Sequence, residues 1–283
     1  GGETITSRVM ALAALAVQDR SMIMSQPHFG ALLRDWRQRR RMSQLDLALE
    51  AEVSARHLSF VETGRSRPSR EMVTRLARQL EVPPREQNTL LVSAGYAPVF
   101  PERSLDDPEL AAVREAVELI LAGHEPVPAL VIDRGWNLLS ANRSAAILLA
   151  GADPALLEPP VNVIRLALHP DGVASRIHNL AELRDALLGR LEHELAITGA
   201  PELIELVEEV RRYPVTPRSR TEVTRPAPIA RSVAIPLELE VGDDVLAFYS
   251  ATTVFGTPVD ITVSELAIES FFPADAATAA FLR

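Results

Sequence analysis

Residues 43–65 read SQLDLALEAEVSARHLSFVETGR, and this stretch decides the fold of the N-terminal part of the chain. Ser43 and Ser54 each stand where a helix N-cap belongs, ahead of apolar residues at helical spacing. Gly64 follows the second run and is typical of a helix end. The stretch therefore predicts two short helices separated by a brief turn.

Three more helices are predicted around this pair. Residues 29–41 carry apolar side chains on one face and arginines on the other. Pro68 and Ser69 open a further helix, and residues 85–94 form a last one that Gly95 closes. We therefore predict an all-α domain over residues 28–95. Residues 1–27 are predicted to be an extension that is partly non-native, because the chain starts with Gly-Gly; a signal peptide is the alternative for them.

The motif of the first domain resembles a known DNA-binding family. The resemblance rests on Ser43-Gln44-Leu45-Asp46-Leu47-Ala48, Val53-Ser54, Leu58, Glu62-Thr63-Gly64-Arg65 and Pro68. These residues are similar to the lambda-repressor-like, or xenobiotic-response-element, helix-turn-helix. The resemblance implies that the domain binds double-stranded DNA and that the N-terminal turn of its third helix enters the major groove.

The resemblance also implies roles for individual residues. It places Ala55, Arg56 and Phe60 against base edges, with Ser54 and Ser59 beside them. Gln44, at a helix N-terminus, is expected to donate to a phosphate. The phosphate contacts that position the protein are expected from three arginines of the following loop: Arg65, Arg67 and Arg70.

Several of these positions carry open alternatives. Arg56 is the best reader of sequence, because a guanidinium can bind O6 and N7 of guanine together. Phe60 either contacts a thymine methyl or packs into the core. Arg39, Arg40 and Arg41 form either a solvated helix end or a DNA contact. Glu52 occupies a turn position that is usually glycine, so we expect the turn to be built differently.

Charge divides the chain in the same way. The net charge of −9 splits into +4 for residues 28–98 and −13 for residues 99–283. A basic N-terminal part, here called the head, joined to an acidic C-terminal part, here called the body, indicates that only the head binds nucleic acid. Residues 96–107, rich in proline and acid, are predicted to be the linker.

The body, residues 108–283, shows strand and helix patterns in a fixed order. Strands are predicted at 129–133, 137–141, 233–240, 245–254 and 261–271, and helices at 109–121, 144–149, 163–168, 180–197 and 201–213. Two strands, several helices and three antiparallel strands give the order of a PAS-like domain. Such a domain packs helices on one face of a five-stranded antiparallel sheet and can leave a pocket between them.

Local sequences of the body resemble the MmyB-like regulators. The similar stretches are Val131-Ile132-Asp133, Trp136-Asn137, Ala141-Asn142, Leu166-Ala167-Leu168-His169-Pro170-Asp171-Gly172 and Asn179-Leu180. The resemblance implies a PAS-like ligand-binding domain for a lipophilic small molecule such as a fatty acid. The candidate ligand-binding residues are Trp136, Asn142, Leu166, His169, Leu183 and Leu187.

Each polar candidate has a structural alternative. Asn142 could cap or turn the chain, His169 could be a satisfied structural histidine, and Trp136 could be a core or turn aromatic. Arg165 and Arg176 could pair with a ligand carboxylate or with neighbouring acids. The spacing of the body histidines does not suit a metal site.

Composition and motifs exclude other classes of function. The chain has no cysteine, so disulfides and thiol nucleophiles are excluded. It lacks the G-x-S-x-G elbow, the phosphate loop and the zinc-protease helix, so we predict no enzyme and no required cofactor. No uncharged apolar run is long enough to span a bilayer. The absence of cysteine fits a reducing compartment, and we expect a cytoplasmic protein.

The sequence thus predicts a sequence-specific transcriptional regulator whose activity is modulated by a fatty-acid-like molecule. The alternative is a constitutive DNA binder whose C-terminal domain serves dimerisation only. In either case we expect a homodimer on a palindromic operator. A single helix-turn-helix domain contacts few bases, and two of them related by a two-fold axis bind a palindrome.

Overall fold

The computed structural model describes residues 28–214, 234–256, 258 and 260–283. The extension predicted for residues 1–27 lies outside these residues, as does Val233. The chain divides into two units between Val99 and Phe100.

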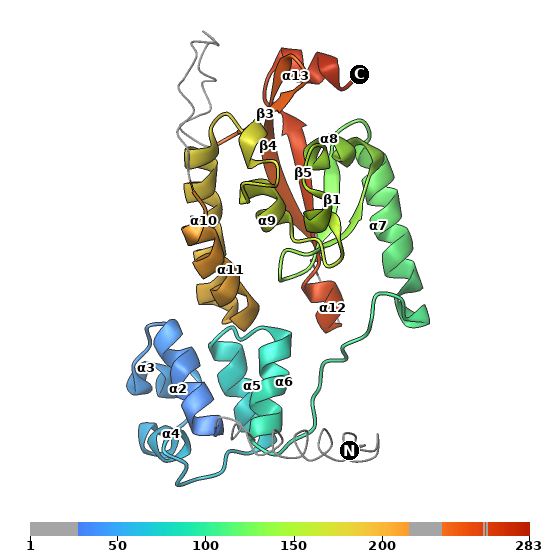
Figure 1. Ribbon diagram of the computed structural model, residues 1–283. Helices are drawn as coiled ribbons and strands as arrows, with labels where there is room; N and C mark the ends of the chain where they lie inside the picture. The colour runs from blue at the N-terminus through green and yellow to red at the C-terminus, as the bar shows by residue number, and fades with distance from the viewer. Residues whose placement is uncertain (1–27, 215–233, 257, 259) are drawn as a thin grey trace, which may run out of the picture. The chain divides into compact units, whose positions relative to one another are not determined.

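The first unit is all-helical, as predicted (Figure 1). Its helices are α2 (Phe29–Arg39), α3 (Gln44–Glu50), α4 (Ala55–Glu62), α5 (Arg70–Gln79) and α6 (Pro84–Ser93). The hydroxyls of Ser43, Ser54 and Ser69 accept hydrogen bonds of 3.1, 3.1 and 3.2 Å from the backbone N–H three residues later. These bonds satisfy backbone donors that a helix start leaves unpaired, and they set where α3, α4 and α5 begin.

The helices of this unit end in a shared way. The residue after each C-cap has a positive φ, and it is Arg41, Glu52, Gly64, Glu81 or Gly95. The next N–H then bonds back to a carbonyl of the last turn, as Val53 N–H does to Ala48 O at 2.9 Å. Glu52 itself has φ +53°, so the turn between α3 and α4 has the geometry usual for this motif. Our expectation of a differently built turn is wrong.

The second unit is built on a five-stranded antiparallel sheet. Its strands are β1 (Ala129–Ile132), β2 (Leu138–Ala141), β3 (Leu237–Val241), β4 (Asp244–Val254) and β5 (Ala267–Pro273). Their order across the sheet is β2-β1-β5-β4-β3. The predicted PAS-like strand arrangement is confirmed.

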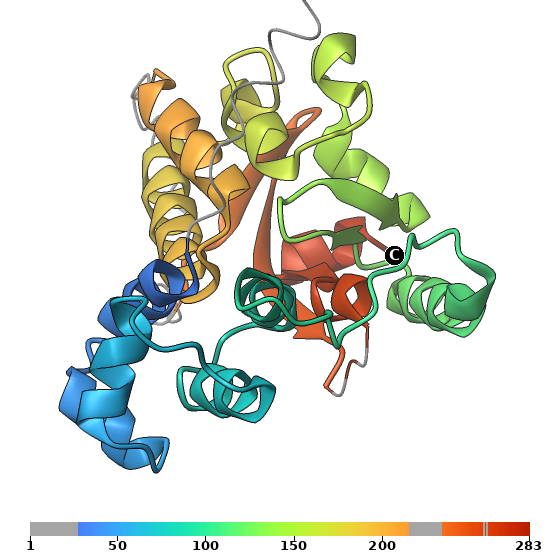
Figure 2. The ribbon, with the colours of Figure 1, turned by 90° about the horizontal axis from the view of Figure 1, so that it is seen from below.

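The helices of the second unit are α7 (Ala111–His124), α8 (Ala146–Leu149), α9 (Val163–Leu168), α10 (Leu180–Thr198), α11 (Pro201–Arg212), α12 (Ile261–Ser264) and α13 (Ala276–Phe281). Short 3-10 turns occupy Pro108–Leu110, Arg143–Ala145, Pro154–Leu157 and Ala174–Arg176. Figure 2 shows α10 and α11 side by side, with α7 on the other side of the sheet. None of the helices in the described part of the chain is long and apolar enough to cross a membrane.

Helices cover both faces of the sheet, whereas we expected them on one face. Alternate residues of β1 point to opposite sides: Ala129 and Val131 pack with α7, and Leu130 and Ile132 join the core under α8 to α11. All four residues of β1 are consequently buried. A strand buried on both faces has a continuous apolar sequence, and Ala129–Ile132 is such a run. The sequence therefore held a sign of the second helical layer that our prediction did not use.

The strand predicted from Ile261 is wrong in its first half. Ile261–Ser264 is a helical turn, and β5 begins only at Ala267. The Asp260 carboxylate accepts from Thr262 N–H at 2.9 Å and caps this turn, and Ile261 N–H donates to Pro101 O. The β-branched residues favour a strand, but this capping and tertiary pairing override that preference.

Candidate functional site

The exposed surface of α4 carries the residues predicted to read bases. Ser54 and Arg56 are exposed, Ser59 and Phe60 are half-buried, and Ala55 packs against the domain core. The Arg56 guanidinium lies 5.4 Å from the centre of the Phe60 ring, one helical turn away. Phe60 is therefore a partly exposed platform beneath Arg56, and the core position considered for it is not observed.

Gln44 is the first residue of α3, as predicted, and a buried carboxylate orients it. Its Nε2 donates to Oε2 of Glu62 at 2.7 Å, and Glu62 is 4% exposed. Arg37 binds the same carboxylate through Nε at 2.7 Å and Nη2 at 3.1 Å. One N–H of the Gln44 amide is engaged in this cluster, and the second is left for an acceptor such as a phosphate.

The charge of Glu62 is stabilised by its neighbours. Burial opposes its ionisation, but hydrogen bonds from Arg37 and Gln44 and the charges of Arg37 and Arg34 outweigh burial. They hold the pKa of the Glu62 carboxyl below its usual value of 4.5. The cluster therefore ties α2, α3 and α4 together while Glu62 is charged.

The arginines predicted to contact phosphate occupy different settings. Arg65 is exposed after α4, and Arg70 is exposed at the first residue of α5. Arg67 instead donates from Nε and Nη2 to Ala94 O, at 3.2 and 3.1 Å, beside Gly95. It has a structural role at the end of α6 that the sequence did not suggest.

Two of the three arginines at positions 39–41 bind groups within their own domain. Arg39 pairs with Asp35 at 2.7 Å, and Arg40 donates to Leu80 O and Glu81 O at 2.8 and 3.1 Å. Arg40 thereby closes the end of α5, a role that the sequence analysis did not consider. Arg41 is exposed in the turn after α2.

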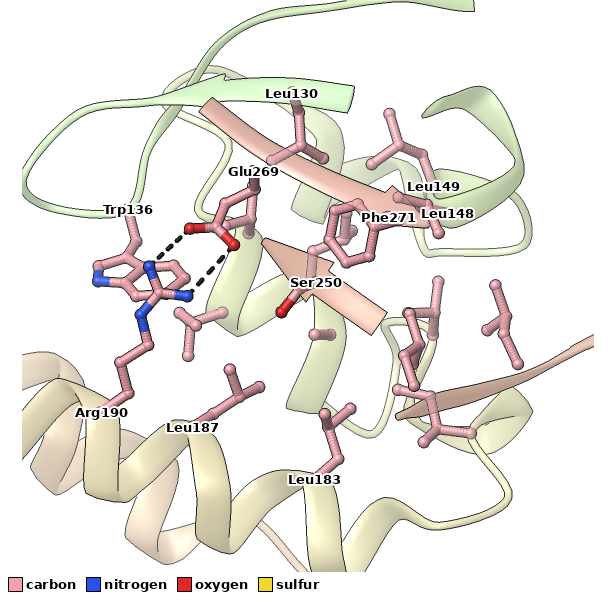
Figure 3. A pocket seen from close by; sticks show the side chains of 18 of the residues that line it. Leu130, Trp136, Leu148, Leu149, Leu183, Leu187, Arg190, Ser250, Glu269 and Phe271 are labelled. Atoms are coloured by element: carbon pink, nitrogen blue, oxygen red, sulfur yellow. Dashed lines mark hydrogen bonds and ion pairs between the residues drawn. The ribbon is translucent and has the colours of Figure 1, made fainter. Parts of the chain in front are cut away.

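In the second unit, a pocket lies between the sheet and helices α8, α9 and α10 (Figure 3). It encloses a cavity of about 110 Å³. Of the predicted ligand residues, Trp136, Leu166, Leu183 and Leu187 line it. Among the described residues of its lining, Arg190, Ser250 and Glu269 are the polar ones, and the remainder are apolar or, like Trp136, aromatic.

Simple periodicities of the chain build this lining. Leu183, Leu187 and Arg190 lie at positions i, i+4 and i+7 of α10, and therefore share one face of the helix. Leu237 and Leu239 on β3, and Glu269 and Phe271 on β5, alternate along their strands and share one face of the sheet. Figure 3 shows Leu183 and Leu187 pointing from α10 toward the strands.

A tight turn delivers Trp136 to the pocket. The Asp133 carboxylate accepts from Gly135 N–H and Asn137 N–H at 2.8 and 2.9 Å, which folds the β1–β2 connection onto itself. Trp136 is held there with φ +64°, a strained conformation for a bulky residue, and is only 4% exposed. Strain of this kind is concentrated at functional sites.

Arg190 and Glu269 form the polar end of the pocket. Arg190 Nη2 lies 2.6 Å from Glu269 Oε1, and the guanidinium lies 4.4 Å from the centre of the Trp136 ring. Arg190 Nε also donates to Glu194, at 3.1 Å. Burial opposes the charge on Arg190, but Glu269 and then Glu194 keep the pKa of the guanidinium above its usual value.

This polar end was missed by the sequence analysis. The sequence held one sign of this polar end: Glu269 is a carboxylate in an apolar strand, two residues from Phe271 and so on the same face. Its partner Arg190 is 79 residues away in the chain, so no local pattern connects the two.

Two predicted ligand residues, Asn142 and His169, do not line the pocket. Asn142 accepts from Ala129 N–H and Ala145 N–H at 3.0 and 3.1 Å and donates to Val127 O at 2.8 Å. His169 ends α9, accepts from Asp171 N–H at 3.1 Å, and packs edge-on against Tyr213. Local polar groups bind both side chains outside the pocket, which is the arrangement expected of structural residues.

The two other arginines considered for a ligand carboxylate also have partners within the protein. Arg165 binds Glu209 through Nε and Nη2, at 2.9 and 2.8 Å. Arg176 donates to backbone carbonyls, including Glu240 O at 2.9 Å. In the described part of the chain, no three histidine or acidic side chains are placed to share a metal ion.

Comparison with known families identifies a domain around each of these two sites. Residues 28–90 match the helix-turn-helix domain family, and residues 113–283 match the MmyB-like transcription regulator ligand binding domain. No curated protein matches the chain significantly. The second match covers more than half of the sequence. The chain therefore belongs to the MmyB-like transcription regulators, and it joins a helix-turn-helix DNA-binding domain to a ligand-binding domain.

Proposed function

We propose that this protein is a sequence-specific regulator whose operator affinity is set by a fatty-acid-like molecule in the pocket of the second unit. By fatty-acid-like we mean a hydrocarbon chain that ends in one polar head group. The observation that supports this proposal is the apolar pocket over the sheet, whose charged lining residues among those described, Arg190 and Glu269, lie together at one end. A lining of this kind suits a long apolar molecule with one polar end.

The same proposal assigns the DNA contacts. Arg56 reads a base, while Gln44, Arg65 and Arg70 contact phosphates. We propose a cytoplasmic homodimer that binds a palindrome, with half-sites about one helical turn of DNA apart. Both matched families are regulator domains, which supports a regulator rather than an enzyme.

The test measures operator affinity with and without a ligand. A preferred DNA site is first selected from random sequence, and its Kd is then measured as long-chain compounds are added. We expect a compound that fills the pocket to change the Kd by about 5- to 150-fold, the usual range of coupling between two sites. If no compound changes either the Kd or the Tm, the protein is a constitutive DNA binder.

A matched pair of variants locates the response. Leu187→Arg places a long charged side chain in the pocket, so we expect it to abolish the ligand response and leave operator binding intact. Leu119→Arg makes the same change on α7, where the side chain is 74% exposed, and should respond like the original protein. Equal responses from both variants would place the ligand elsewhere.

A further inference from the structure

The polar end of the pocket carries more acid than base. Glu269 is 3% exposed, and it receives hydrogen bonds from Arg190 Nη1 and Nη2 at 3.2 and 2.6 Å and from Thr252 Oγ1 at 2.7 Å. Arg190 also binds Glu194, which accepts in addition from Trp136 Nε1 at 2.8 Å. One guanidinium therefore serves two carboxylates, and the cluster has a net charge of −1.

Little of the Arg190 guanidinium is left for a ligand. Its Nε–H, one Nη1–H and both Nη2–H groups have acceptors, namely Glu194, Glu269 and Thr252. Four of its five N–H groups are thus engaged within the described part of the chain. The Trp136 ring covers the guanidinium at 4.4 Å. Glu269 Oε2, by contrast, accepts one hydrogen bond and has room for another.

We propose, on the basis of the proposed function, that this pocket selects lipophilic molecules whose head group donates a hydrogen bond and carries no negative charge. Alcohols and protonated amines belong to this class, and free carboxylates do not. Glu269 is the residue that determines the choice, because it presents an acceptor and a negative charge to the head group.

A carboxylate head group is disfavoured for two reasons. Beside Arg190 it would add a third negative charge to a cluster that holds one positive charge. To take Arg190 for itself, it would have to displace Glu269, and a buried carboxylate that loses its partner is strongly destabilised. A hydroxyl or ammonium group meets neither obstacle, because it donates to Glu269 and leaves the Arg190 pair in place.

The experiment compares three compounds with the same chain: dodecanol, dodecylamine and dodecanoate. Binding to the full-length protein is measured at neutral pH by calorimetry, below the concentration at which the compounds form micelles. We expect the alcohol and the amine to bind at least about tenfold more tightly than the carboxylate. The ammonium group is attracted to Glu269 and the hydroxyl donates a hydrogen bond to it, whereas the carboxylate is repelled by it.

Glu269→Gln tests the assignment to one residue. Without this negative charge, the ratio of the Kd of dodecanoate to the Kd of dodecanol or dodecylamine should fall by about tenfold or become smaller than one. Glu240→Gln is the matched control: it makes the same charge change on β3, outside the pocket lining, and should keep the original ranking. If Glu269→Gln does not fold, the order in which the original protein binds the three compounds still tests the head-group inference.

The possible failures are distinct. Dodecanoate binding as tightly as dodecanol would overturn the head-group inference and leave the proposed function standing. An unchanged ranking in a folded Glu269→Gln variant would overturn the role of Glu269. Binding of none of the three compounds would overturn both the inference and the fatty-acid-like ligand on which it rests.

Discussion

We propose that sequence-specific recognition by this protein depends on Arg56. It is exposed on α4 and rests on the half-buried ring of Phe60. We expect Arg56→Ala to weaken binding to the preferred site by about 1–3 kcal/mol and to relax selection at one base pair. The measurement is the Kd for the preferred site and for a set of single-base variants of it.

Arg65→Ala is the control for this prediction. Arg65 lies in the loop after α4, where a phosphate contact carries no sequence information. Its loss should weaken all DNA sequences alike. If Arg56→Ala also weakens every sequence equally, Arg56 does not read a base.

We expect Glu62 to make the stability of the first unit sensitive to acid. The pKa of its carboxyl is lowered in the folded protein, so its contribution is present above its usual pKa of 4.5 and is lost as the pH falls through the folded value. We expect Glu62→Gln to lower the free energy of unfolding by about 2–3 kcal/mol at neutral pH. That difference should shrink below about pH 4.5. Urea unfolding of both proteins across this pH range checks it, and a difference that persists in acid would contradict it.

At the scale of the element, the turn between α3 and α4 carries a strained residue. Glu52 has φ +53°, a conformation that glycine adopts without strain. We expect Glu52→Gly to raise the free energy of unfolding by about 0.5–1 kcal/mol, because the relief of strain exceeds the entropy that glycine adds to the unfolded chain. Chemical denaturation measures the change.

At the end of α4, the reverse change can be made, because a glycine with positive φ can be replaced by a residue that has a Cβ. Gly64 has φ +74°, and a Cβ there would lie 3.0 Å from the His28 ring. Gly64→Ala should therefore lower the free energy of unfolding by about 1 kcal/mol or more. If Glu52→Gly were also destabilising, the Glu52 side chain would have to make a contact that compensates for its strain.

Elements with local signals could be predicted from the sequence. The serine caps and apolar spacing place α3, α4 and α5 because the hydrogen bonds that start these helices are local. The turn at Ile261–Ser264 could not be predicted in this way. Its cap, Asp260, is held by Arg103 at 2.9 Å, 157 residues away, and the β-branched residues of the turn themselves favour a strand.

For the molecule as a whole, we expect the uneven distribution of charge to show in the salt dependence of DNA binding. Each phosphate contact releases counterions, so the slope of log K against log salt reports the number of contacts. We expect Arg70→Gln to reduce that slope by about 1, since Arg70 is exposed at the N-terminus of α5. Arg212→Gln makes the same change in the acidic unit and should leave the slope unchanged, although its side chain is 77% exposed. A changed slope for Arg212→Gln would place the second unit on DNA.

The pocket shows how far sequence reasoning extends across the whole chain. Leu183 and Leu187 share one face of α10, so helical spacing groups them in the sequence. Trp136 also lines the pocket, although its place in a turn offered a structural role as the alternative. The Arg190–Glu269 pair could not be identified from the sequence, because folding brings together residues from α10 and β5. Asn142 and His169 lie outside the pocket lining, and the sequence held no sign of this because it does not show which backbone groups a polar side chain will bind.

The two tryptophans of the chain are divided between its two units. Trp36 is 5% exposed in the core of the first unit, with Arg39 and Arg40 near its ring, and Trp136 is 4% exposed in the wall of the pocket. Each unit therefore contains its own intrinsic fluorophore. With Trp36 replaced by phenylalanine, the remaining tryptophan emission comes from the indole that stacks on Arg190, and we expect its wavelength and intensity to change when a molecule enters the pocket.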